Sequence, residues 1–231
     1  MVKQILILAS IVFIFAGIAN QNDKQNPSTE PFAVANVYFE QNATDGDVEV
    51  VFEIKGNDEG LNKLTIISPD NRTVLDLTAP ENSTMGIRQF RFESPEPKDV
   101  ESLKAAYPEG TYKFSGATAK GTEFQSECTL NHNLPETVFI LYPGAEAENV
   151  NISNLKITWT PVKKIVSYIL EIDQAELGIN LLVKLPASGT SFTVPKDFLQ
   201  AGKEYTLSIG TVTKENNRSF VETAFLTTGE E

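Results

Sequence analysis

Apolar residues occupy every second position over most of the chain, a pattern typical of strands that bury one face. In VEVVFEIK, Val48, Val50, Phe52 and Ile54 fall on one side of the predicted strand. Turn-forming residues such as those at 69–71 separate the alternating runs. The same alternation recurs in the first half at Phe90 and Phe92 and at Tyr112 and Phe114.

The second half repeats the pattern around the single tryptophan, Trp159. We expect its indole ring to fill the space between two sheets, which pack about 10 Å apart. Pro161 should end that strand, because proline cannot donate to the ladder. The alternating sets are Leu155, Ile157 and Trp159; Tyr168, Leu170 and Ile172; Leu181, Val183 and Leu185; Phe192 and Val194; Tyr205, Leu207 and Ile209; and Val221, Thr223 and Phe225.

One helix interrupts the strands, and we predict it at about residues 98–106. Pro97, Asp99 and Glu101 suit its start, and Pro108 should end it. An apolar stripe of Val100, Leu103 and Ala106 should face the core. The pattern therefore predicts an all-β chain of two β-sandwich domains, the N-terminal one immunoglobulin-like and carrying this short helix.

Four segments divide the chain. Residues 1–19 are a predicted signal peptide, because Lys3 precedes an apolar run from Ile5 to Ala19. We expect a cut before Asn20; the alternative is an uncleaved N-terminal anchor, although the run is shorter than a membrane span needs. Residues 20–31 are a predicted flexible leader, residues 32–134 the first sandwich, and residues 135–231 the second. These features predict a secreted or periplasmic protein without membrane insertion after signal cleavage.

The net charge of −12 argues against nucleic acid as a partner, because phosphate binding depends on Lys and Arg. Removal of Lys3 with the signal peptide would make the charge −13. Cys128 is the single cysteine, so no disulfide forms within the chain. In FQSECTL it alternates with Phe124 and Leu130, which predicts a core side chain rather than a reactive thiol.

The second half resembles a fibronectin type III domain. The resemblance is carried by Pro143, by Trp159 in ITWTPV, by Tyr168 in SYILEI, and by Leu199 and Tyr205 in FLQAGKEYTLSIGTV. It implies a tyrosine corner, in which the Tyr205 hydroxyl meets backbone near Leu199. It is specific for fold and says little about function.

The whole chain also resembles a set of uncharacterised bacterial exported proteins that contain a fibronectin type III domain. The matching segments are Thr44–Asp47 (TDGD), Glu93–Pro97 (ESPEP), Pro108–Tyr112 (PEGTY) and Asn131–His132. This resemblance implies periplasmic or extracellular residence and no established activity.

No motif of a nucleophile, metal protease or phosphate loop occurs in the sequence. His132 is the only histidine, so a catalytic or zinc role lacks the usual partners. Two acidic loops offer Asp45 and Asp47, and Asp58 and Glu59. They are either ordinary turn residues or a weak calcium site, the one cofactor that the sequence raises.

The sequence thus predicts an exported, non-enzymatic binding or spacer protein that contacts another protein or a surface glycan. The alternatives are a carboxylate-dependent hydrolase and a structural accessory protein of an envelope complex. A cleft with two close carboxyl groups of raised pKa would favour the hydrolase. Five Asn-x-Ser/Thr sequons begin at Asn42, Asn71, Asn82, Asn151 and Asn217; they would carry glycans in a eukaryotic secretory route and be silent in a bacterium.

Overall fold

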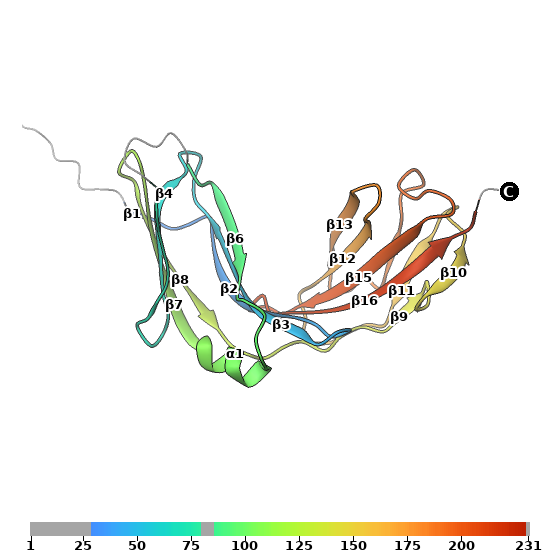
Figure 1. The fold of residues 1–231 in the computed structure, drawn as a ribbon, viewed down its shortest axis with the longest axis horizontal. Coiled ribbons are helices and arrows are strands. Elements are labelled where there is room, and N and C mark those ends of the chain that lie inside the picture. Colours follow the sequence, from blue (N-terminus) through green and yellow to red (C-terminus); the bar gives the residue numbers. More distant parts are fainter. Residues whose placement is uncertain (1–28, 80–85, 230–231) are drawn as a thin grey trace, which may run out of the picture.

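The computed structural model describes residues 29–79 and 86–229. These residues form two β-sandwiches and one short helix, which confirms the predicted all-β fold class. Figure 1 shows the sandwiches as two limbs that meet where four strands run together: β2 (Val34–Asn42), β3 (Asp47–Lys55), β15 (Glu204–Val212) and β16 (Arg218–Thr227). The predicted signal peptide and the start of the leader lie outside the described residues.

The first sandwich packs a three-stranded sheet, in the order β2-β3-β6, against a sheet in the order β1-β8-β7-β4-β5. The helix α1 connects β6 to β7. The elements are β1 (Thr29–Glu30), β2 (Val34–Asn42), β3 (Asp47–Lys55), β4 (Leu61–Ile67), β5 (Thr73–Thr78), β6 (Gln89–Glu93), α1 (Val100–Ala106), β7 (Gly110–Thr118) and β8 (Glu123–Leu130).

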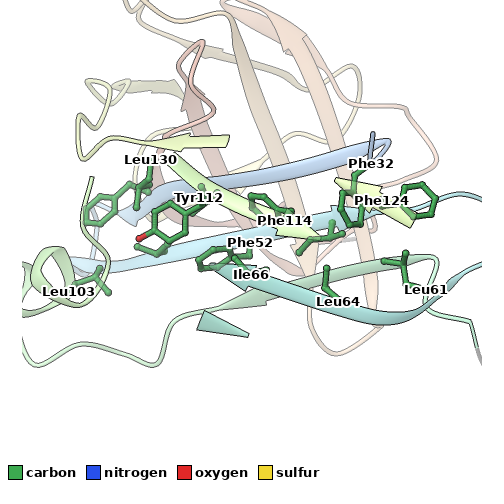
Figure 2. Packing of buried hydrophobic residues seen from close by; sticks show 14 of the residues in the cluster. Phe32, Phe52, Leu61, Leu64, Ile66, Leu103, Tyr112, Phe114, Phe124 and Leu130 are labelled. Carbon is green, nitrogen blue, oxygen red and sulfur yellow. The ribbon is translucent and has the colours of Figure 1, made fainter. Parts of the chain in front are cut away.

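The core of the first sandwich is rich in phenylalanine. Phe52 is fully buried at its centre, stacked on Phe92 at 4.8 Å between ring centroids, with the Tyr112 ring edge-on at 5.8 Å. Figure 2 shows the rings of Phe52 and Tyr112 between the strands, with Leu103 of α1 at one end of the cluster. The predicted inward set of Val48, Val50, Phe52 and Ile54 is confirmed, because all four are buried.

The second sandwich has the same strand order as the first. Apart from β10, the second sandwich has seven strands. The first, second and fifth of these form the sheet β9-β11-β14, and the other four form the order β16-β15-β12-β13. The extra strand β10 pairs beside β16. The strands are β9 (Ile140–Tyr142), β10 (Ala147–Val150), β11 (Lys156–Trp159), β12 (Ser167–Gln174), β13 (Ile179–Pro186), β14 (Ser191–Thr193), β15 (Glu204–Val212) and β16 (Arg218–Thr227).

Trp159 lies between the two sheets, as predicted, with only 1% of its surface exposed. The Tyr168 ring meets it edge-on at 5.6 Å, and the Tyr168 hydroxyl accepts a hydrogen bond from the amide of Val162. The tyrosine corner is present as well: the Tyr205 hydroxyl accepts from the amide of Gln200 at 2.8 Å, and Gly202 supplies the positive φ of the turn. The fibronectin type III-like interpretation of this half is therefore confirmed at the level of the fold.

Two local predictions need correction. Thr29 and Glu30, at the end of the predicted flexible leader, form β1 and pair with β8 in parallel, and Phe32 beyond them is buried against Phe124. The helix buries only Leu103 of the predicted stripe; Val100 and Ala106 are exposed, because α1 crosses the end of the sandwich instead of lying along it.

The two sandwiches share one sheet. β16 of the second pairs in parallel with β2 of the first, with Arg218, Ser219 and Phe220 opposite Glu40, Gln41 and Asn42. The sheet therefore runs without a break from β13 through β16 and β2 to β6. We call this junction the seam. Leu134 still packs on the first core, whereas Val138 belongs to the second.

Candidate binding groove at the domain junction

A groove with a volume of about 360 Å³ lies over the seam, on one face of the shared sheet. Both sandwiches supply its walls, and none of its lining residues is Lys or Arg. Six of them carry carboxyl groups. The lining residues are Glu40, Gln41, Asn42, Asp47 and Glu49 from the first sandwich, and Glu171, Asp173, Thr206, Ser208, Phe220 and Glu222 from the second.

Strand register explains why these acids gather. Residues directly opposite each other on neighbouring strands point to the same face. Glu49 lies opposite Glu40, and Ser208 lies between Glu171 and Glu222. Alternation within each strand thus places carboxylates from four strands on one surface. In Figure 1, β6 and β13, the edges of this sheet, stand on either side of the open side of the molecule.

Phe220 forms an apolar part of the groove. It lies opposite Gly210 in the sheet, and its ring covers that glycine. A Cβ atom at Gly210 would fall 2.4 Å from Cε1 of Phe220. The missing side chain therefore lets the ring lie flat along β15.

Two arginines sit on the side of the groove toward the first sandwich. Arg218 donates to Glu40 at 3.2 Å and to Glu53 at 3.3 Å, and its guanidinium lies 4.0 Å from the centre of the buried Tyr38 ring. Arg91 donates to Glu40 and pairs with Glu93. Cation–π contact and paired carboxylates together hold the buried charge of Arg218 in place.

The pKa of two groove carboxyl groups is raised. For Glu40 the main cause is burial, which the charges of Arg218 and Arg91 oppose. For Glu49 burial also raises the pKa, followed by the negative charges of Glu40 and Asp47. Burial likewise raises the pKa of the Tyr38 hydroxyl, which donates to Glu53. Like charges held side by side on a half-buried surface favour a cation that neutralises them.

The wall from the second sandwich has no such neutralisation. Within residues 29–79 and 86–229, no Lys or Arg forms a salt bridge with Asp173, Glu171 or Glu222. Glu171 accepts a hydrogen bond from Asn180, and the Glu222 side chain is exposed. This wall therefore presents uncompensated negative charge to solvent.

The four residues of the calcium hypothesis are not brought together. Asp45 lies in the turn between β2 and β3, and Asp47 is the first residue of β3; Asp45 accepts hydrogen bonds from the amide of Asp47 and from the Asn42 side chain. Asp58 and Glu59 follow the far end of β3. Asp58 pairs with Arg88.

Glu59 is already engaged by the turn between β7 and β8. It accepts hydrogen bonds from Thr118, Lys120 and Thr122, and the first of these contributes most to lowering its pKa. Sequence reasoning missed a different set: in the described part of the chain, Glu40, Glu49 and Glu93 have carboxylate oxygens within 4.8 Å of one another. These three residues are brought together by the register between strands, which cannot be seen in the sequence.

His132 and Cys128 have structural contacts in this fold. The His132 ring packs on Phe39 at 4.9 Å, and its Nε2 lies 2.8 Å from the carbonyl oxygen of Tyr107. Cys128 packs against the first core, with its Sγ 3.8 Å from the carbonyl oxygen of Val37. Both side chains lie among backbone and aromatic groups.

The comparisons with known proteins assign no family to the chain. No family model matches the chain, and no curated protein matches it. Among solved structures, it is similar to fibronectin(III)-like modules of Clostridium thermocellum CbhA (13% identity, 85% of this chain and 92% of that chain covered, TM-score 0.36). It is also similar to a two-domain fibronectin type III segment of chicken tenascin (15%, 86% and 100%, TM-score 0.32) and to the fn3 domain of human collagen alpha-1(XX) chain (22%, 43% and 88%, TM-score 0.32).

With TM-scores this low, the fold assignment depends on the strand order and the tyrosine contacts described above. The resemblance to bacterial exported proteins gains no support from the comparisons and stays a prediction. Among the residues described, no helix has both the length and the apolar character of a membrane span.

Proposed function

We propose that this protein is a non-enzymatic binding module that holds a basic segment of a partner protein in the junction groove. One observation carries the proposal. The shared sheet joins the two sandwiches, so the acidic walls from β2, β3, β12 and β16 form one preassembled surface. A surface that needs no rearrangement before binding saves the ordering cost of association.

Charge decides among the classes of partner. Six carboxyl groups line the groove, and lysine or arginine side chains of a partner would complement them. Nucleic acid and acidic glycans would be repelled. Neutral glycans would leave the uncompensated charge of Glu171, Asp173 and Glu222 without a counter-charge. A basic protein segment therefore fits better than the surface glycan that the sequence left open.

A carboxylate-dependent hydrolase is the second candidate, and a specific observation favours it. Glu40 and Glu49 are close, line a groove and have raised pKa values, which is the criterion set out from the sequence. Against it, Arg218 and Arg91 hold both oxygens of Glu40, which leaves Glu49 without a free carboxylate partner on that side. Glycosidase and esterase assays of wild type and Glu49→Gln test this candidate; turnover that Glu49→Gln abolishes would replace the binding proposal.

We further propose that the protein acts outside the cytoplasm, as a secreted or periplasmic chain. The apolar run from Ile5 to Ala19, preceded by Lys3, supports this. N-terminal sequencing of the protein recovered from its native host tests it: a chain starting at Asn20 agrees, and a chain retaining Met1 in the cytosol contradicts it.

Calcium at the β2–β3 turn is a separate proposal, supported by Asp45 and Asp47 at the groove's end. A thermal unfolding series with millimolar calcium tests it. Loss of any calcium-dependent shift in Asp45→Asn, with the shift retained in Asp58→Asn, would assign the site to this turn. No shift in wild type would end the idea.

The binding proposal is tested with a synthetic oligolysine peptide titrated into the full chain. The variant Glu171→Gln/Asp173→Asn/Glu222→Gln removes the uncompensated wall. We expect its dissociation constant to rise about tenfold, because partly exposed charge pairs contribute about 0.2–1 kcal/mol each. Affinity should also fall with added salt.

A matched control removes three carboxylates elsewhere: Asp76→Asn on β5, Glu127→Gln on β8 and Glu148→Gln on β10, all exposed and outside the groove. The control removes the same number of negative charges as the groove variant. Equal weakening by both would show that only the total charge matters and would contradict a groove site.

A further inference from the structure

Asn217 occupies a buried position at the end of the seam. It lies between Asn216, which has a φ of 73°, and Arg218, in the hairpin that joins β15 to β16. Only 1% of its surface is exposed. Its side chain nevertheless forms hydrogen bonds outside the second sandwich, whereas the turn itself requires none.

The amide of Asn217 connects three segments of the chain. Its Oδ1 accepts from the backbone amide of Phe39 in β2, at 2.9 Å. Its Nδ2 lies 3.0 Å from the carbonyl oxygens of Asn131 and Asn133, and from Oδ1 of Asn131, in the linker between the sandwiches. One side chain thus bonds the first sandwich, the linker and the second sandwich.

We infer that Asn217 is a positioning residue for the groove: it sets the angle at which the wall of the second sandwich meets that of the first. The inference rests on the proposed function only for its effect on binding. Its effect on geometry follows from the contacts, because the register of the seam covers only three residue pairs. So short a ladder needs a fixed end to define an angle.

The chemistry of the amide suits this role. The contacts require an acceptor for the Phe39 amide and donors for the linker carbonyls, and asparagine supplies both from one planar group. A buried N–H group that loses its acceptor costs free energy, so opening at this point is opposed. The same burial predicts that the sequon at Asn217 carries no glycan in the folded protein, since its Nδ2 is engaged.

The far end of the seam is held by contacts at the exposed surface. The amide of Ala43 donates to the carbonyl oxygen of Phe220, and the Thr44 hydroxyl accepts from the amide of Glu222. Thr44 is exposed. We therefore expect Thr44→Ala to loosen the seam less than Asn217→Ala does, and to fold in any case.

Spin labels across the open side of the molecule measure the angle directly. Gln89 on β6 and Lys184 on β13 are exposed and stand on opposite limbs, so each is replaced by Cys in a Cys128→Ser background. We expect one narrow distance distribution in the parent, a shifted or broadened one with Asn217→Ala, and a smaller change with Thr44→Ala. Thr213→Ala is the control, because the Thr213 hydroxyl accepts a hydrogen bond from the backbone amide of Asn217 within the hairpin and, among the described residues, makes no side-chain hydrogen bond to the first sandwich.

The same variants are titrated with the oligolysine peptide. We expect Asn217→Ala to bind about tenfold more weakly, equivalent to 1.4 kcal/mol, although every groove residue is retained, and Thr213→Ala to bind as the parent does. An unchanged distance distribution in both Asn217→Ala and Thr44→Ala overturns the inference. If the distance changes and even the parent fails to bind, the proposed function fails while the positioning role stands.

Discussion

The two sandwiches have one strand order and two different cores. The first centres on Phe52 and its stacked neighbours, and the second on Trp159 with Tyr168 edge-on. Their corner tyrosines occupy equivalent places, Tyr112 near the start of β7 and Tyr205 near the start of β15, yet their hydrogen bonds run in opposite directions. The Tyr112 hydroxyl donates to the carbonyl oxygen of Pro108, whereas the Tyr205 hydroxyl accepts from the amide of Gln200.

This difference shows that the fold requires a polar tether at the corner and not one particular bond. A hydroxyl can donate or accept, so tyrosine serves both corners. The helix α1 precedes the first corner, where the carbonyl of Pro108 accepts the tether, while the amide of Gln200, just before the turn at Ala201 and Gly202, donates the tether of the second. Aromatic area in each core contributes the main stabilisation.

Removing the central aromatic of the second sandwich should have the largest effect. Trp159→Ala should lower the free energy of unfolding by about 3–5 kcal/mol, the range for large core truncations. Chemical denaturation of the full chain measures it. Phe139→Ala is the control, because Phe139 is 76% exposed in the same sandwich and should change stability little. Equal effects of the two would contradict the packing described for the second core.

The two corner tyrosines should differ in a predictable order. Tyr205→Phe leaves an amide without its acceptor, and Tyr112→Phe leaves a carbonyl oxygen, which keeps a second lone pair for other donors. We expect losses of about 1–2 kcal/mol for Tyr205→Phe and about 0.5–1 kcal/mol for Tyr112→Phe. Thermal unfolding compares them with Tyr142→Phe, a half-exposed tyrosine outside both corners. A larger loss for Tyr112→Phe than for Tyr205→Phe would contradict the assignment of an unpaired amide to one corner and an unpaired carbonyl oxygen to the other.

The smallest effect should come from the groove. The pKa of Glu49 is raised from its ordinary value of 4.5, so its contribution to stability is fully present below that pH and is lost as pH rises. Glu49→Gln should therefore stabilise the protein at neutral pH by about 0.5 kcal/mol, since like charges opposite each other in a sheet repel. The gain should vanish near pH 4. Denaturation curves across this range would refute the account if Glu49→Gln were destabilising at pH 7.

Local pattern was enough to predict most of each sandwich. Alternation alone identified the inward faces of β3 and β12. The tyrosine corner at Tyr205 was implied by the resemblance to fibronectin type III domains. Proline and acidic residues located the helix within two residues of its observed start. These features depend on neighbours in sequence, which the pattern records.

The groove depends on long-range pairing, and the pattern does not record it. β2 and β16 are 178 residues apart at Glu40 and Arg218, and neither strand carries a sequence feature that identifies the other as its partner. Glu40 and Glu49 were unremarkable outward residues until register placed them opposite each other. The sequence instead drew attention to the turns at Asp45 and Asp58, where clustered acids are visible along the chain.

Amide hydrogen exchange at Phe39 and Ala43 tests the shared sheet most directly. Their amides donate across the seam, to the Asn217 side chain and to the carbonyl oxygen of Phe220. If the sandwiches are joined as described, both amides should exchange about as slowly as those paired between β2 and β3. Exchange at the rate of exposed turn amides, with β3 still protected, would show that the seam opens and that the groove has no fixed shape.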